Sequence, residues 1–150
     1  MAYWLMKSEP SEYGIDDLVR DKKSAWFGVR NYQARNFMRD DMELDDQVFF
    51  YHSSCPEPGI VGLCKVASKP IPDVTQFKKG DFFDPKSTPE KPIWICVEVA
   101  IVKKTRLVPL ATIRATPELA SMRILQRGNR LSITPVAEEE WNFVTKHLMK

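Results

Sequence analysis

The stretch Ile93-Trp94-Ile95-Cys96-Val97-Glu98-Val99-Ala100-Ile101-Val102 decides the class of fold. Every second residue from Ile93 to Ile101 is a β-branched aliphatic, and the residues between them include Trp94, Cys96 and Glu98. Successive side chains of a β-strand point to opposite faces of its sheet, so this alternation predicts a strand over residues 93–102. The domain is therefore expected to be built around a sheet.

Four further short segments favour strands by their apolar, β-branched or aromatic content. They are residues 3–6, 47–52, 60–66 and 131–134. Between residues 67 and 92 five prolines interrupt any periodicity, which predicts a long loop. Such loops are uncommon inside a compact domain and are often functional.

Four short helices are expected among these strands. The first begins near residue 15, and the second is capped by the side chain of Asn31. The third begins at Thr116, a hydroxyl cap followed by a proline and an acid, and ends at Gly128. The last covers residues 138–148. Strands and helices do not alternate, so the pattern indicates an α+β fold on a curled sheet or pseudo-barrel, as one domain over residues 1–150.

Composition excludes several classes of protein. The chain has 150 residues, of which 43% are hydrophobic, as in an ordinary globular domain. We expect no membrane span, because no apolar run reaches the roughly 18 residues that a span requires. No targeting signal is evident, so a cytoplasmic location is expected. Three cysteines, Cys55, Cys64 and Cys96, cannot all pair with one another, which favours free thiols in a reducing compartment.

Charge is segregated although the net charge is only +2. Residues 20–39 hold six basic groups and one acid, and residues 103–130 hold seven basic groups and one acid. Acids gather at residues 40–46 and 138–140. Such segregation can create a positive face that attracts a polyanion, and it is equally consistent with two solvated basic segments.

The most unusual stretch is Trp26-Phe27-Gly28-Val29-Arg30-Asn31-Tyr32-Gln33-Ala34-Arg35-Asn36. It joins aromatic rings, guanidinium groups and amides around a glycine. Aromatic faces stack on bases, amides read base edges, and arginine pairs with phosphate. A structural alternative remains open, in which Trp26 belongs to the core and the arginines form surface ion pairs.

Three smaller clusters contain polar groups at the ends of expected strands. Lys7-Ser8-Glu9 follows the first strand, and Tyr51-His52-Ser53-Ser54 ends another. Gln126-Arg127-Gly128-Asn129-Arg130 suits close approach to a phosphate backbone but lacks the spacing of a Walker loop. Each has a structural alternative, such as an ion pair between Lys7 and Glu9. With two histidines in the chain and no C-x-x-C spacing, we expect no metal site.

Together these residues resemble the EVE-domain family. The matching blocks, in chain order, are Trp4-Leu5-Met6-Lys7-Ser8-Glu9-Pro10, Trp26-x-Gly28-Val29-Arg30-Asn31-Tyr32-x-Ala34-Arg35-Asn36, Phe50-Tyr51-His52-Ser53, Gly59-Ile60-Val61-Gly62 and Arg130-Leu131-Ser132. The resemblance implies a PUA-like mixed β pseudo-barrel of about five or six strands with flanking short helices. It also implies binding of DNA or RNA, with a modified base of the methylated or hydroxymethylated cytosine type held in a pocket.

On this interpretation the chain is a monomeric binding module without a cofactor. The base pocket is expected to be formed by Lys7, Ser8, Glu9, Trp26, Asn31, Tyr32, His52, Ser53 and Trp94. The phosphates are expected to contact Arg30, Arg35, Arg127 and Arg130. The alternative is a hydrolase acting on a modified nucleoside or nucleotide, with His52 or Glu9 as the base. A reader of a partner peptide is a third possibility.

Overall fold

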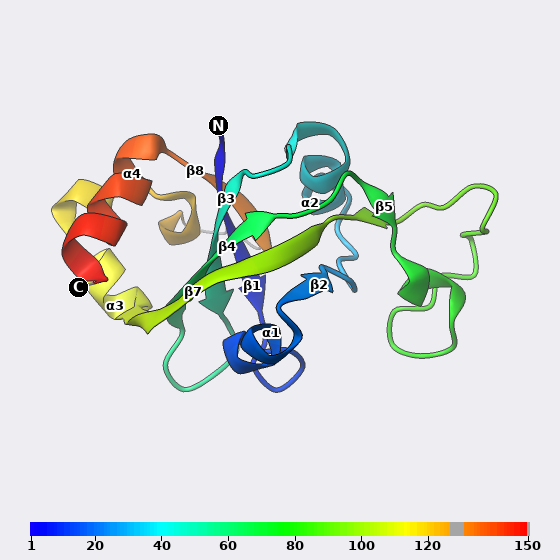
Figure 1. The fold of residues 1–150 in the computed structure, drawn as a ribbon, viewed down its shortest axis with the longest axis horizontal. Helices are drawn as coiled ribbons and strands as arrows, with labels where there is room; N and C mark the ends of the chain where they lie inside the picture. The colour runs from blue at the N-terminus through cyan, green and yellow to red at the C-terminus, as the bar shows by residue number, and fades with distance from the viewer. Residues whose placement is uncertain (127–130, 150) are drawn as a thin grey trace.

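A computed structural model describes residues 1–126 and 131–149. A six-stranded sheet in the order β2-β7-β4-β3-β1-β8 forms its centre (Figure 1). The strands are β1 (Tyr3–Ser8), β2 (Lys23–Ala25), β3 (Gln47–His52), β4 (Gly59–Val66), β7 (Glu98–Pro109) and β8 (Ile133–Val136). β1 runs parallel to β3 and every other neighbouring pair is antiparallel, so the sheet is mixed. The predicted α+β class is confirmed.

Both faces of the sheet are buried at β1 and β3, whereas residues in the middle of β7 are exposed. On β1, Trp4 and Met6 belong to one cluster of buried residues and Leu5 to the other; β3 divides its side chains in the same way. Side chains of a strand alternate between faces, so two apolar layers require an apolar residue at nearly every position. This explains the continuous hydrophobic runs in β1 and β3.

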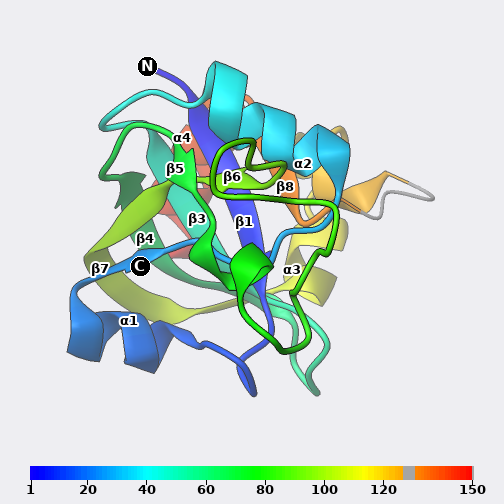
Figure 2. The same cartoon turned by 90° about the vertical axis from the view of Figure 1, so that its right-hand side faces the viewer.

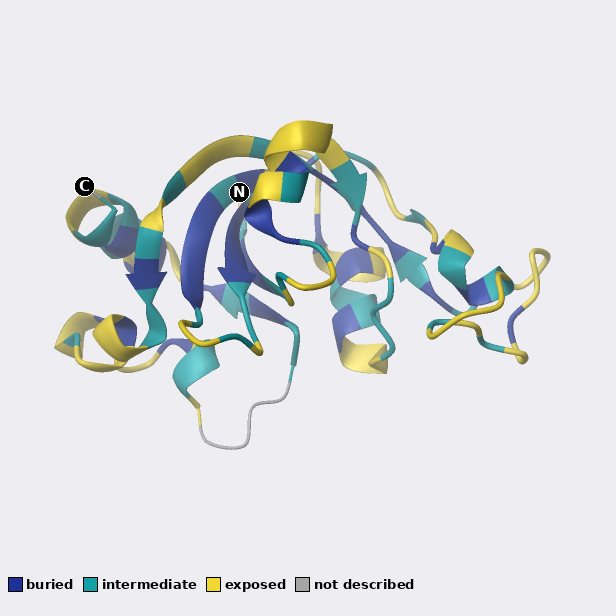
Figure 3. Cartoon of the chain, turned by 90° about the horizontal axis from the view of Figure 1, so that it is seen from below, coloured by how far each residue is buried: buried dark blue, intermediate teal, exposed yellow. Residues whose placement is uncertain are grey.

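Helices cover the two faces from opposite ends (Figures 1 and 3). One cluster includes buried residues of α1 (Ile15–Asp21) and of α2 (Tyr32–Asn36), which continues as a π-helical turn over Phe37–Asp41. The other includes α3 (Leu110–Arg114) and α4 (Glu138–Phe143), which ends in a π-helical turn over Val144–Leu148.

The sheet is open and curved. Register shifts interrupt the pairing of β3 with β4 and of β4 with β7, and such irregularities bend and twist a sheet. Beyond it, β5 (Ile71–Pro72) and β6 (Ile95–Cys96) form a small two-stranded sheet. The loop between them contains a 3₁₀ turn over Val74–Phe77 and extends to one side of the molecule, where it faces the viewer in Figure 2.

The predicted strand over residues 93–102 is divided into β6 and β7, a correction to the sequence pattern. The Gln76 side-chain amide occupies the backbone N–H and carbonyl of Trp94, so strand pairing begins only at Ile95. At Val97, between the two strands, the carbonyl accepts from Trp26 N. β7 then continues to Pro109 because it pairs along β4.

The predicted helix from Thr116 is also wrong. The structure has 3₁₀ turns at Pro117–Leu119 and Arg123–Leu125, and the α-helix α3 precedes them. The Thr116 hydroxyl donates to the carbonyl of Thr112 and does not cap the following turn, so the expected helix start is lost. Gly128, its expected end, lies outside the described residues.

Candidate nucleic-acid interface

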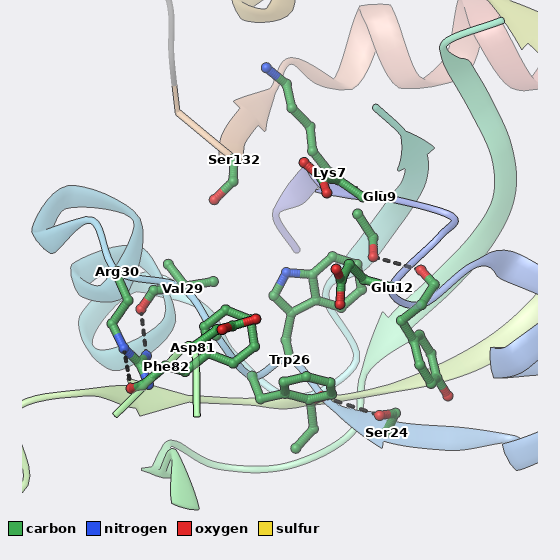
Figure 4. Close-up of a pocket in the computed structure, with 15 residues that line it drawn as sticks. Lys7, Glu9, Glu12, Ser24, Trp26, Val29, Arg30, Asp81, Phe82 and Ser132 are labelled. Carbon is green, nitrogen blue, oxygen red and sulfur yellow. Dashed lines mark hydrogen bonds between the residues drawn. The ribbon is translucent and has the colours of Figure 1, made fainter. Parts of the chain in front are cut away.

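A cavity of about 370 Å³ lies at the end of β1 where β2 and the loop between β5 and β6 approach it (Figure 4). Clefts of this size commonly hold small organic groups. Its walls combine aromatic rings with carboxylates and hydroxyls. The lining residues are Lys7, Ser8, Glu9, Glu12, Tyr13, Ser24, Ala25, Trp26, Phe27, Gly28, Val29, Arg30, Asp81, Phe82 and Ser132.

Trp26 belongs to the cavity wall and to the core at once. Its backbone N–H donates to Val97 O at 2.8 Å, and its ring meets Phe50 edge-on with centroids 5.3 Å apart. Only 8% of the residue is exposed. Trp26 is therefore buried, as the structural alternative expected, and it also lines the cavity, while its contact with a base stays a prediction.

Gly28 allows the Phe82 ring to reach the cavity wall. Its φ of +82° is in the left-handed region that favours glycine, and a Cβ placed there would lie 2.8 Å from Cζ of Phe82. Its N–H donates to Asp73 Oδ2 at 2.7 Å. A side chain at this position would therefore push against the ring that forms one wall.

Arg30 fastens the loop that carries Phe82. Its guanidinium donates twice to the Phe82 carbonyl, at 3.1 and 2.7 Å, and contacts Asp73 Oδ2 at 3.2 Å and Thr75 Oγ1 at 3.1 Å. Asp73 is only 2% exposed, and a buried carboxylate needs such partners. In this arrangement Arg30 is directed at its own chain, while its predicted phosphate contact remains a prediction.

The turn after β1 brings further polar groups to the rim. The Ser8 hydroxyl donates to Tyr13 O at 2.6 Å, and His52 Nε2 accepts from Ile15 N at 3.0 Å. Burial lowers the pKa of His52 below its usual 6.5, which favours the neutral ring that can accept this bond. Ser8 and His52 therefore position the turn that contains Glu9 and residues up to 14.

The rim is predominantly acidic. Glu9, Glu12 and Asp81 are exposed carboxylates that line the cavity. Lys7 is half-buried, and burial lowers the pKa of its ammonium group. The cavity therefore offers acceptors for amino groups at several points and donors from Lys7 and the hydroxyl groups of the lining.

The structure gathers part of the predicted pocket and separates the rest. Lys7, Ser8, Glu9 and Trp26 line the cavity together. Outside its lining lie Asn31, Tyr32, His52, Ser53 and Trp94. Tyr32 stacks on Trp94 with centroids 4.9 Å apart, and Asn31 Oδ1 caps α2 by accepting from Ala34 N. The ligand contacts of all nine residues stay predictions.

Of the other arginines predicted to contact phosphates, the structure describes Arg35 but not Arg127 and Arg130. Arg35 donates to Ile93 O at 2.9 Å and to Asn36 Oδ1, with its guanidinium 4.9 Å from the centre of the Tyr32 ring. Arg127 and Arg130 lie outside the described residues. The phosphate roles of these three arginines therefore remain predictions.

Sequence reasoning missed several lining residues. Glu12 and Tyr13 lie in a turn, and Asp81 and Phe82 lie in the proline-interrupted loop, where no periodicity marks a position. Only the length of that loop hinted at a functional segment. The residues meet because hydrogen bonds such as that from Gly28 to Asp73 join parts of the chain that are far apart in sequence.

The described residues show no group of histidine, cysteine and acidic side chains that could hold a metal ion. Burial raises the pKa of the Cys64 and Cys96 thiols to about 12, whereas Cys55 is half-buried; all three cysteines are free. Over the part of the chain that the structure describes, no helix has the length and apolar character needed to cross a membrane.

Comparison with known proteins finds similar sequences and similar solved structures. Thymocyte nuclear protein 1 of Homo sapiens is 42% identical over 163 residues, which cover 95% of this chain and 72% of that protein. A crystal structure of a Pseudomonas syringae protein is 44% identical and covers 96% of this chain and 97% of its own, with a TM-score of 0.92.

A crystal structure that is similar to this chain contains a ligand. It is the human THYN1 protein in complex with DNA containing 5-methylcytosine, 41% identical over 96% of this chain and 95% of that chain, with a TM-score of 0.88. A family model described as EVE domain matches residues 2–147. Because that match extends over nearly the whole chain, this protein belongs to the EVE-domain family.

Proposed function

We propose that this chain, acting as one domain, binds DNA or RNA and places a modified base of the methylated or hydroxymethylated cytosine type in the cavity beside Trp26. The observation that carries the proposal is the cavity itself, an aromatic-walled space of about 370 Å³ with polar groups at its rim. The complex of the human relative with 5-methylcytosine DNA supports it.

The rim chemistry suits the edge of a cytosine. Cytosine presents an amino donor beside acceptor atoms, and carboxylates accept from that amino group. Glu9, Glu12 and Asp81 supply carboxylates, while Lys7 and Ser132 can donate to the acceptors. The apolar walls at Val29 and Phe82 offer contact to a methyl group without a competing polar partner.

Phosphates are expected to bind away from the mouth, because rim carboxylates repel them. Lys78 and Lys79 are exposed in the same loop as Asp81, and Lys22 is exposed beside β2. With roughly three to four phosphate contacts on a single strand, the logarithm of affinity should fall with the logarithm of salt concentration with a slope of about −2 to −3.

The deciding experiment is a titration of matched oligonucleotides with cytosine, 5-methylcytosine or 5-hydroxymethylcytosine, as DNA and RNA, single- and double-stranded, at two salt concentrations. We expect a preference for one modified base, and Lys7→Met should weaken binding of cytosine and its modified forms alike, because it removes a donor to acceptor atoms that all of them carry. Lys65→Met is the matched control, because Lys65 is exposed and does not line the cavity. Its Nζ lies 3.8 Å from Oδ1 of Asp45. Equal affinities for modified and unmodified strands would contradict the proposal.

We propose binding without turnover. His52, a candidate base for the alternative hydrolase, has its Nε2 engaged by the N–H of Ile15 and does not line the cavity. Incubation with modified nucleosides and nucleotides should therefore give no product. Glu9, the other candidate base, does line the cavity, so conversion that depends on either His52 or Glu9 would favour the hydrolase.

A further inference from the structure

Phe27, a large apolar side chain at the cavity mouth, has no role in the contacts proposed for the modified base. Phe27 lines the cavity, yet 41% of the residue is exposed. Trp26, the preceding residue, is nearly buried. Two consecutive residues thus place one aromatic ring within the wall and a second, more exposed ring at the rim.

The Phe27 ring is held from two sides. The ring of Tyr13, from the turn after β1, has its centroid 6.5 Å from that of Phe27, with the two planes at 77°. The ring of Phe82, from the loop between β5 and β6, has its centroid 6.1 Å from that of Phe27, with the planes at 66°. The bond from Gly28 N to Asp73 fixes the backbone that follows it. An exposed aromatic ring that is already held loses little conformational freedom when a ligand binds to it.

We propose that Phe27 stacks on the base next to the modified base, so that the site takes an oligonucleotide in preference to a free nucleoside. This inference rests on the proposed function, in which a base enters the cavity. Drawing one base out of a strand leaves the face of its neighbour uncovered. Aromatic side chains stack on such faces, and phenylalanine is among the residues that insert between base steps.

The acidic rim favours this kind of contact. A neighbouring nucleotide approaches a mouth that carries Glu12 and Asp81, where a phosphate is repelled. Stacking on an apolar ring needs no charge and involves the base alone. Phe27 can therefore hold the neighbour by its base while its phosphate faces away from the carboxylates.

The test compares Phe27→Ala and Phe27→Leu with the wild type on two ligands. These are free 5-methyl-2′-deoxycytidine and a short single-stranded oligodeoxynucleotide with one central 5-methylcytosine. Both variants should weaken oligonucleotide binding by about five- to 150-fold, the range of one base–aromatic stack, and change nucleoside binding less than about twofold. Phe83→Ala is the matched control, because Phe83 is 46% exposed but does not line the cavity, and both of its affinities should be unchanged.

Thermal melting of the same samples serves as the control that the variants are folded. Equal losses for nucleoside and oligonucleotide would make Phe27 part of the base pocket and overturn the inference, and so would unchanged oligonucleotide binding in Phe27→Leu. A wild-type protein that binds neither ligand would overturn the proposed function together with it. If the wild type binds and only Phe27 proves neutral, the proposed function stands.

Discussion

Gly28→Ala should remove the Phe82 ring from the cavity wall. A residue with a side chain pays ~1–2 kcal/mol for the left-handed backbone of Gly28, whose φ is +82°. The new Cβ would lie 2.8–3.0 Å from three Phe82 ring atoms, and displacing a packed ring costs a further ~1–3 kcal/mol. The free energy of unfolding should therefore fall by about 2–5 kcal/mol, which for this chain length lowers Tm by roughly 4–20 °C.

Gly80→Ala separates the two contributions. Gly80 has a φ of +146°, and a Cβ there would have nothing within 4 Å, so its substitution strains only the backbone. Calorimetric melting and titration with a 5-methylcytosine oligonucleotide should show lower stability for both variants and weaker binding for Gly28→Ala alone. In a Phe82→Ala background, Gly28→Ala should cost less than in the wild type, with a coupling of about 1–3 kcal/mol. An equal cost in both backgrounds would refute the proposed collision.

Three other substitutions test the site and its supports. Trp26→Ala should destabilise the chain by roughly 3–5 kcal/mol and abolish most discrimination between modified and unmodified bases. Thermal melting and binding titration of the same sample measure the two effects. A folded variant with intact discrimination would remove Trp26 from the site. Because the pKa of His52 is lower in the folded chain than its usual 6.5, the unfolded state binds more protons as the solution becomes acidic. The free energy of unfolding should therefore fall as pH decreases through about 6.5. Denaturant titrations at several pH values should show a weaker dependence of this free energy on pH for His52→Gln. The same pH dependence in variant and wild type would contradict this. Asp73→Asn should cost roughly 3 kcal/mol, because it leaves the Arg30 guanidinium without its carboxylate, and a melting temperature equal to that of the wild type would rule this out.

Much of the sheet was predictable because its signals are local. The runs at residues 3–6, 47–52 and 60–66 lie within β1, β3 and β4, where alternation or continuous apolar character follows directly from burial of one or both faces. The helix expected after Thr116 is absent because the Thr116 hydroxyl donates back to the carbonyl of Thr112, which lies in α3, and does not cap a following turn.

The site was less predictable because distant loops complete it. Lys7 was expected at the end of the first strand and Trp26 within the aromatic and arginine-rich stretch at residues 26–36, and the structure places both at the cavity. Phe82 reaches it only because Arg30 and Asp73 fasten its loop, a contact between residues about fifty positions apart that no periodicity records. Local patterns locate the side chains of one segment, whereas the wall of a cavity depends on how separate segments meet.

The interior position of β1 has a consequence for how the chain folds. β1 lies between β3 and β8, so its hydrogen bonds are completed only when residues 133–136 have been synthesised. Until then its apolar side chains lack part of their cover, and pairings between remote segments form slowly. During translation the nascent sheet therefore exposes an incomplete edge that can aggregate or bind a chaperone. Released chains that end before residue 133 should be more sensitive to protease than the full-length chain.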